Sequence, residues 1–131
     1  MADKSRVTVH RRNVSIDFDG VIHAYTTPWT VATEIHDDPV DGAFAFIREC
    51  IDNGYGVHIH TARANDATVE RAMVEWFHRH GLEFYYIDRL NISPLKKGAV
   101  IYIDDRGWRF EGVFPTLHLI EQLKQWNKES T

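Results

Sequence analysis

The residues best suited to chemistry are two pairs of aspartates, each placed after an apolar run. Residues 14–16 lead into Asp17-Phe18-Asp19 and then Gly20, and residues 99–103 lead into Asp104-Asp105. Carboxylates brought close together repel one another unless a cation neutralises them, and Mg²⁺ prefers oxygen ligands. The two pairs therefore predict a magnesium site with four candidate ligands, Asp17, Asp19, Asp104 and Asp105.

The apolar periodicity indicates which elements would position these groups. The first strand ends at the first aspartate pair, and further strands are expected at 55–60, 84–87 and 100–103. Helical spacing predicts helices over 41–53 and 66–80, and a last one from Thr116 that carries Leu117, Ile120, Leu123 and Trp126. Short strands separated by helices predict a three-layer α/β/α Rossmann-like fold with a parallel sheet.

In a parallel sheet the C-terminal ends of the strands meet at one edge, where ligands bind. Asp17, Asp19, Thr61 and Asp104 are therefore expected to converge, and the segment 93–98 would bring Lys96 and Lys97 to the same rim. This set suits phosphoryl transfer, in which positioning and charge neutralisation dominate. One carboxylate can attack phosphorus, while a second acid two residues away protonates the leaving oxygen and then activates water.

The order of these residues resembles the four motifs of the haloacid dehalogenase-like (HAD) phosphohydrolases over about residues 13–115. The resemblance implies that Asp17 is the nucleophile and a magnesium ligand, and that Asp19 is the general acid/base and lends its backbone carbonyl to the metal. Thr61 would hydrogen-bond the phosphoryl group. Asp104 would bind Mg²⁺, while Asp105 would bind it directly, through water, or by orienting Asp104.

The family's catalytic lysine pairs with the phosphate and the nucleophile. Lys96 fits this role best by its distance from Asp104. Relatives often read Lys-Pro here, whereas this chain has Lys96-Lys97-Gly98. The choice between Lys96 and Lys97 therefore stays open.

Two segments, Thr61-Ala62-Arg63 and Ile103-Asp104-Asp105-Arg106, are also similar to phage polynucleotide kinase 3′-phosphatase domains and to small phage and bacterial HAD proteins. This similarity favours a nucleotide or a nucleic-acid terminal phosphate as substrate, with Arg63 clamping a phosphate. Residues 22–40 take the place of the family's cap and are too few for a folded domain. Aromatic rings here could stack on a base or sugar, so the candidate substrate contacts are His23, Tyr25 and Trp29.

The site is then open, or another subunit of a homo-oligomer supplies the missing lid. The 131 residues form one domain, in which 1–12 read as a leader, and the net charge of −4 gives no general attraction to nucleic acid. The single cysteine, Cys50, excludes an internal disulfide and is expected in the core. With no signal peptide or long apolar span, a cytoplasmic location without a membrane partner is expected.

Several other readings compete with this one. Asp-x-Asp also occurs in metal-dependent glycosyltransferases, and phosphorelay receivers use Asp, Thr and Lys in a different order. His58 and His60 have the spacing of some zinc sites, although buried histidines beside the active site are preferred. A small sugar phosphate or another metabolite is a rival substrate. A non-catalytic binding or regulatory module that retains the fold is the rival from another class.

Overall fold

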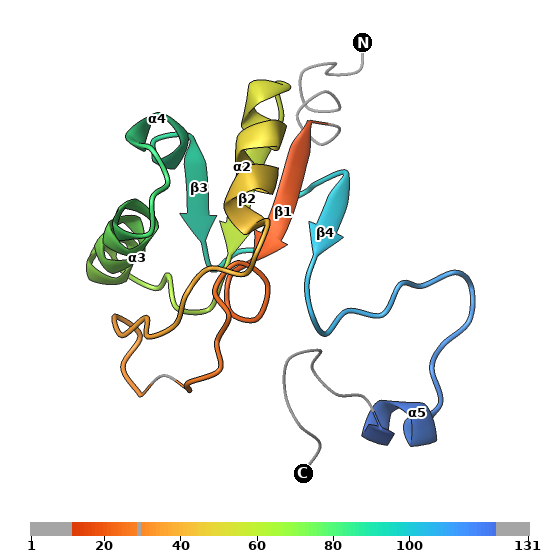
Figure 1. The fold of residues 1–131 in the computed structure, drawn as a ribbon. Coiled ribbons are helices and arrows are strands. Elements are labelled where there is room, and N and C mark those ends of the chain that lie inside the picture. Colours follow the sequence, from red (N-terminus) through yellow and green to blue (C-terminus); the bar gives the residue numbers. More distant parts are fainter. Residues whose placement is uncertain (1–11, 29, 123–131) are drawn as a thin grey trace.

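The computed structural model describes residues 12–28 and 30–122, so most of the expected leader and Trp29 lie outside the described residues. The fold is α/β (Figure 1). Its elements follow in the order β1 (Asn13–Asp17), α2 (Ala43–Asp52), β2 (Gly56–His60), α3 (Ala67–Arg79), α4 (Phe84–Ile87), β3 (Leu90–Ser93), β4 (Ile101–Ile103) and α5 (Leu117–Gln122).

The four strands form one sheet in the order β3-β2-β1-β4, and all neighbours are parallel. The register places Asp17 beside His60 and His60 beside Ser93, so these strands end at one level. Because side chains alternate along a strand, residues paired across the sheet share a face. One face is apolar and includes Val14, Ile16, Val57 and Ile59, whereas the other is polar and includes Ser15, Asp17, His58, His60, Asn91 and Ser93.

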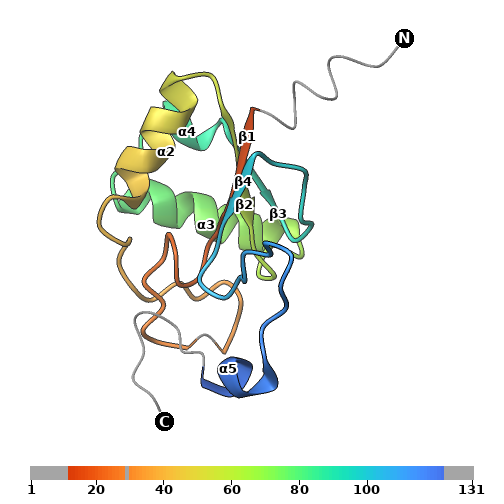
Figure 2. The ribbon, with the colours of Figure 1, turned by 90° about the vertical axis from the view of Figure 1, so that its right-hand side faces the viewer.

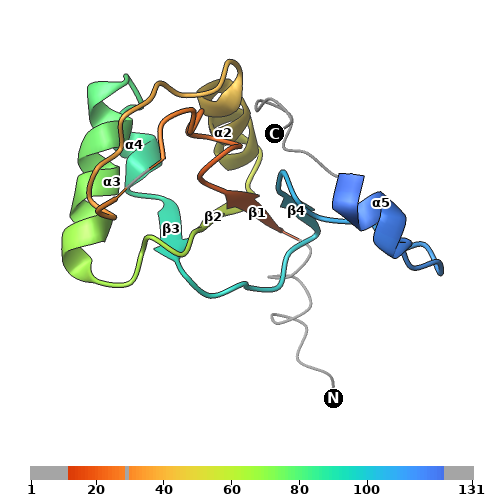
Figure 3. The ribbon, with the colours of Figure 1, turned by 90° about the horizontal axis from the view of Figure 1, so that it is seen from below.

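The core lies on the apolar face of the sheet. Figures 2 and 3 show α2 and α4 on this side of the sheet, while α3 runs past the β3 edge. Val69, Met73, Trp76 and Phe77 of α3 are buried here together with the apolar strand residues. The helix α5 lies beyond the β4 edge in Figure 1.

The predicted helices match α2 and α3 closely. The side chain of Asp66 caps α3 by accepting hydrogen bonds from the backbone N–H groups of Thr68 and Val69. The strand expected at 84–87 is wrong, because this segment is the helical turn α4 and the third strand follows it at Leu90–Ser93. The Glu83 carbonyl accepts from Tyr86 and Ile87 and closes this turn. A short apolar run has no periodicity that distinguishes the two structures.

The buried positions expected from the sequence are partly confirmed. Cys50 is buried, as predicted, and so are Trp76 and Phe77. Trp108 and Phe110, whose apolar rings favour the core, are 45% and 56% exposed. They follow β4 in a segment that is not packed on the sheet (Figure 1). None of the described helices has the length and apolar composition needed to cross a membrane.

Candidate active site

The C-terminal end of β1 carries Asp17, whose environment penalises negative charge. Phe18 donates its backbone N–H to Asp17 Oδ1 at 3.0 Å. Burial and then the negative charge of Asp105, with smaller contributions from Asp104 and Asp19, raise the pKa of Asp17 to about 7. The structure therefore brings the two acidic pairs within electrostatic reach of each other, as the sequence predicted.

A tight turn after Asp19 allows the second acidic loop to approach the first. Gly20 has a φ of +89°, and its N–H donates to the His23 carbonyl at 2.8 Å. A Cβ atom at Gly20 would collide with the carboxylate of Asp105. Glycine is thus required here both for its backbone conformation and for the space it leaves. A pocket of about 280 Å³ lies between the two loops, lined by Gly20, Val21, Val40, Ile103, Asp104 and Asp105.

Asp104 is oriented by the loop that follows β4. Its Oδ1 accepts hydrogen bonds from the backbone N–H groups of Arg106 and Gly107, both at 2.6 Å. The first residue of the acidic pair is therefore held by its own loop. Arg106 takes part in this arrangement through its backbone N–H, and this contact does not involve a substrate.

Asp19 has a different environment from Asp17. Its Oδ1 lies 2.8 Å from His23 Nδ1, and its Oδ2 accepts from Arg63 Nε at 2.7 Å. Burial by itself would raise the pKa of Asp19, but the hydrogen bonds from His23 and Arg63 and the positive charge of Arg63 outweigh it and hold the pKa below its usual value. The pKa values of Asp17 and Asp19 are thus shifted in opposite directions by their surroundings.

His23 and Arg63 also bind the loop 22–40. His23 Nε2 accepts from the backbone N–H of Asp37 at 3.0 Å, so its proton is on Nδ1, which donates to Asp19. Arg63 Nη1 donates to the carbonyls of Ala32 and Glu34 at 3.0 and 2.7 Å. Both side chains are completely or almost completely buried. They connect the loop to Asp19.

These contacts give Arg63 and His23 a role that the sequence did not predict. Both were expected to touch substrate, whereas the structure places them between Asp19 and the loop. The i, i+4 relation of Asp19 and His23 was the available signal. Tyr25, the other described candidate in the loop, is partly buried with a φ of +55° and lies near Arg63, whose Cζ is 5.8 Å from the ring centroid.

Thr61 follows β2 at the same edge of the sheet. It is buried, its N–H donates to the Ser93 carbonyl at 3.1 Å, and its Oγ1 accepts from the N–H of Arg63 at 3.2 Å. Because Oγ1 accepts this bond, its own hydrogen is left to donate elsewhere. The structure thus places Thr61 directly after β2, at the edge of the sheet where β1 ends in Asp17.

The two candidate lysines lie on the polar side of the sheet. Lys96 Nζ is 4.5 Å from the ring centroid of Tyr102, and Lys97 Nζ donates to Asn91 Oδ1 at 3.3 Å. Burial and then the charge of Lys97 lower the pKa of His58. Neither of these contacts involves Asp17, so the structure leaves the choice between the two lysines open.

The donor set fits magnesium better than zinc. Within residues 12–28 and 30–122, no three His, Cys, Asp or Glu side chains are grouped as ligands of one metal ion. Zinc sites need at least three such ligands, so His58 and His60 do not form one in this arrangement. Mg²⁺ keeps several waters and takes only one or two protein carboxylates. Asp17 with Asp104 or Asp105 meets that need, and their mutual repulsion calls for a cation.

Comparison of the chain with protein-family models, characterised proteins and solved structures gives no significant match.

Proposed function

We propose that this protein is a magnesium-dependent phosphomonoester hydrolase with a three-layer HAD-like fold, acting in the cytoplasm through an aspartyl-phosphate on Asp17. The observation that carries the proposal is the placement of Asp17, which ends a parallel strand, is partly buried, and lies in the field of Asp105 and Asp104. The negative charges around Asp17 destabilise its ionised form, so a purely structural role does not account for a carboxylate at this position. The motif order from Asp17 through Thr61 to Asp104 supports the same chemistry.

Asp17 must be ionised to attack phosphorus, and its neighbours oppose this. Its pKa of about 7 leaves much of it protonated at neutral pH. Asp17 with Asp104 or Asp105 would hold Mg²⁺, with the backbone carbonyl of Asp19 as a further ligand. When bound, Mg²⁺ supplies positive charge that lowers the pKa of Asp17 and neutralises phosphoryl oxygens.

Asp19 serves as the proton-transfer group in both halves of the reaction. In the first half, an Asp17 oxygen bonds to phosphorus and the bond to the leaving oxygen breaks. The leaving oxygen takes its proton from the protonated form of Asp19, which the contacts with His23 and Arg63 make the minor form. In the second half, water attacks phosphorus, Asp19 takes its proton, and Asp17 is released with inorganic phosphate. The bonds from His23 and Arg63 stabilise ionised Asp19, the form that the second half requires.

The remaining groups position the phosphoryl oxygens. Thr61 has a hydroxyl hydrogen to donate, because its Oγ1 accepts from Arg63 N–H. One of Lys96 and Lys97 would move from its present contact to pair with the phosphate. Both lie in the stretch between β3 and β4, whose conformation can supply that movement without disturbing the strands.

The substrate class proposed is a nucleotide or a nucleic-acid terminal phosphate. The resemblance at Thr61-Ala62-Arg63 and Asp104-Asp105-Arg106 supports it, together with a loop 22–40 that is too short to close over the site as a domain. Tyr25 is the described aromatic residue of this loop that could contact a base or sugar. A small sugar phosphate is the rival within the same chemistry.

The test is phosphate release from a generic aryl phosphate, with Mg²⁺ and with a chelator. Asp17→Asn is compared with Asp38→Asn, which removes an exposed carboxylate outside the site. Turnover that needs Mg²⁺, disappears in Asp17→Asn and persists in Asp38→Asn supports the proposal. Turnover retained by Asp17→Asn contradicts it.

Substrate class is then tested with nucleotides and with 3′- and 5′-phosphorylated oligonucleotides. Faster hydrolysis of these than of sugar phosphates supports the nucleotide assignment, and the reverse order favours the metabolite. Mg²⁺ binding by titration without hydrolysis of any phosphomonoester would favour a non-catalytic module.

A further inference from the structure

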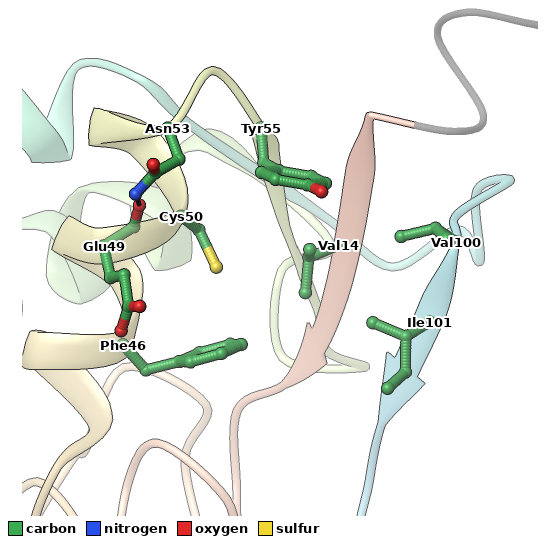
Figure 4. Close-up of a pocket in the computed structure, with 8 residues that line it drawn as sticks. All are labelled: Val14, Phe46, Glu49, Cys50, Asn53, Tyr55, Val100 and Ile101. Atoms are coloured by element: carbon green, nitrogen blue, oxygen red, sulfur yellow. Dashed lines mark hydrogen bonds between the residues drawn. The ribbon is translucent and has the colours of Figure 1, made fainter.

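An apolar groove lies on the α2 side of the sheet, at the edge formed by β4. It has a volume of about 380 Å³ and is lined by Val14, Phe46, Glu49, Cys50, Asn53, Tyr55, Val100 and Ile101. Figure 4 shows Phe46 and Cys50 pointing from α2 toward the strands, with Val14 and Ile101 facing them. Ile101 is nevertheless 50% exposed, although it belongs to the sheet. Among residues 12–28 and 30–122, no element covers the core at this groove.

The same chain carries a second apolar surface after β4. Leu117 and Ile120 of α5 are 76% and 47% exposed, and Val113 and Phe114 are exposed as well. The described contacts of this segment are internal, since Trp108 Nε1 donates to the Val113 carbonyl and the Phe110 ring lies against Phe114. Large exposed apolar surfaces of this kind mark an interaction site.

We infer that the C-terminal segment, defined as residues 117–131, docks as a helix into the groove between α2 and β4. Its apolar residues recur every three positions, at Leu117, Ile120, Leu123 and Trp126, and in a helix of 3.6 residues per turn such positions span about half of the circumference. Phe46, Cys50 and Ile101 present the complementary surface. Docking removes both apolar surfaces from water, and this provides the driving force.

The connection between β4 and the C-terminal segment permits this docking. Residues 104–116 separate Ile103 from Leu117, and an extended chain of this length spans roughly 40 Å. A tethered segment has an effective concentration in the range of about 1 mM or more, far above that of a second molecule in dilute solution. The chain's own segment is therefore the favoured occupant, ahead of a second copy.

Charge at the groove is consistent with the same occupant. Glu49 lies on the rim, and the C-terminal segment contains Lys124 and Lys128. A docked helix would also secure the far end of the loop 104–116. This loop begins with Asp104 and Asp105, so docking would limit its movement at the acidic pocket.

The test uses Cys50, which lines the groove and is the only cysteine of the chain. Ile120→Cys places a thiol on the apolar face of α5, and His118→Cys places one on the opposite face as a matched control. Both full-length proteins are oxidised at micromolar concentration and analysed by mass and by non-reducing electrophoresis. We expect a monomeric Cys50 disulfide in Ile120→Cys, formed on the order of tenfold faster than in His118→Cys, a ratio equivalent to about 1.4 kcal/mol.

Three outcomes would overturn the inference: equal rates in both variants, no disulfide in Ile120→Cys, or disulfide-linked dimers in place of the monomeric product. The last outcome would show that a second copy occupies the groove. Circular dichroism of the reduced proteins establishes that both variants are folded.

A second measurement avoids engineered cysteines. Cys50 is alkylated in the wild-type chain, in Ile120→Glu and in the control His118→Glu. A charge on the docking face opposes burial, so Ile120→Glu should expose the groove and raise the alkylation rate of Cys50 several-fold, with no change in His118→Glu. Equal rates in all three proteins would contradict docking.

Discussion

Arg63 and Asp19 lie forty-four residues apart and are joined by a 2.7 Å contact between Nε and Oδ2, in which Arg63 is 1% exposed. The same guanidinium donates from Nη1 to the carbonyls of Ala32 and Glu34. One side chain thus links the segment after β2 with the acid that follows β1 and with the loop over the site. The proposed acid/base and the loop are held by the same group.

Replacing Arg63 should destabilise the protein markedly. Arg63→Met leaves Asp19 and two carbonyls without their donor, and breaking a buried ion pair costs about 3–5 kcal/mol. Arg63→Lys keeps the charge but has no planar fork to reach Asp19 and the loop together, so an intermediate loss is expected. Urea unfolding measures both changes. Arg71 is exposed, so Arg71→Met is the control. An equal decrease in the free energy of unfolding in Arg71→Met would contradict the proposed role of Arg63.

The stability of the metal-free protein should depend on the ionisation of Asp17. Burial and then Asp105 raise its pKa from 3.8 to about 7, so the folded protein keeps this proton over a range in which the unfolded chain loses it. Asp17 therefore lowers the free energy of unfolding progressively as the pH rises from about 4 to about 7. Above pH 7 the decrease in the free energy of unfolding is complete and stays constant.

This dependence can be isolated with Asp17→Asn. With a chelator present, the variant should melt at a higher temperature than wild type at pH 8, and the difference should shrink as the pH falls toward 4. Thermal melts across this pH range provide the measurement, with Asp38→Asn as control. A difference that does not vary with pH would show that the charge of Asp17 is not destabilising.

Gly20→Ala should disturb the approach of the two acidic loops. Gly20 and Gly81 both have positive φ values, +89° and +99°, so an alanine at either position strains the backbone. An added Cβ at Gly20 meets the Asp105 carboxylate, whereas at Gly81 it meets nothing within 4 Å. Gly20→Ala should therefore weaken Mg²⁺ binding and hydrolysis, while Gly81→Ala affects only stability. Calorimetric titration and phosphate release compare them, and equal effects would contradict the loop contact.

The two lysines can be separated by activity. We expect Lys96→Ala to lower kcat by about 10²–10³-fold, the usual effect of removing a group that stabilises a transition state. Lys97→Ala should retain activity, because Lys97 is already paired with Asn91. Steady-state hydrolysis of the aryl phosphate measures both. The opposite ranking would assign the phosphate contact to Lys97.

Much of the candidate site was predictable because its position depends on local pattern. An apolar run followed by Asp17-Phe18-Asp19-Gly20 places carboxylates at the end of a buried strand, wherever that strand lies. The capping of α3 by Asp66 is equally local, since its hydrogen bonds reach only Thr68 and Val69. The parallel arrangement then brings strand ends together, which places Thr61 and Asp104 at the same edge.

The sequence alone therefore determined the α/β class, the positions of α2 and α3, and the convergence of the acidic residues, because periodicity and caps are encoded over short stretches. The tertiary structure decided that Arg63 and His23 bind Asp19 and the loop, because those contacts depend on which distant groups a buried side chain meets. It also decided that 84–87 is helical and that Trp108 is exposed. Four residues carry too little periodicity, and burial requires a partner surface that no local pattern specifies.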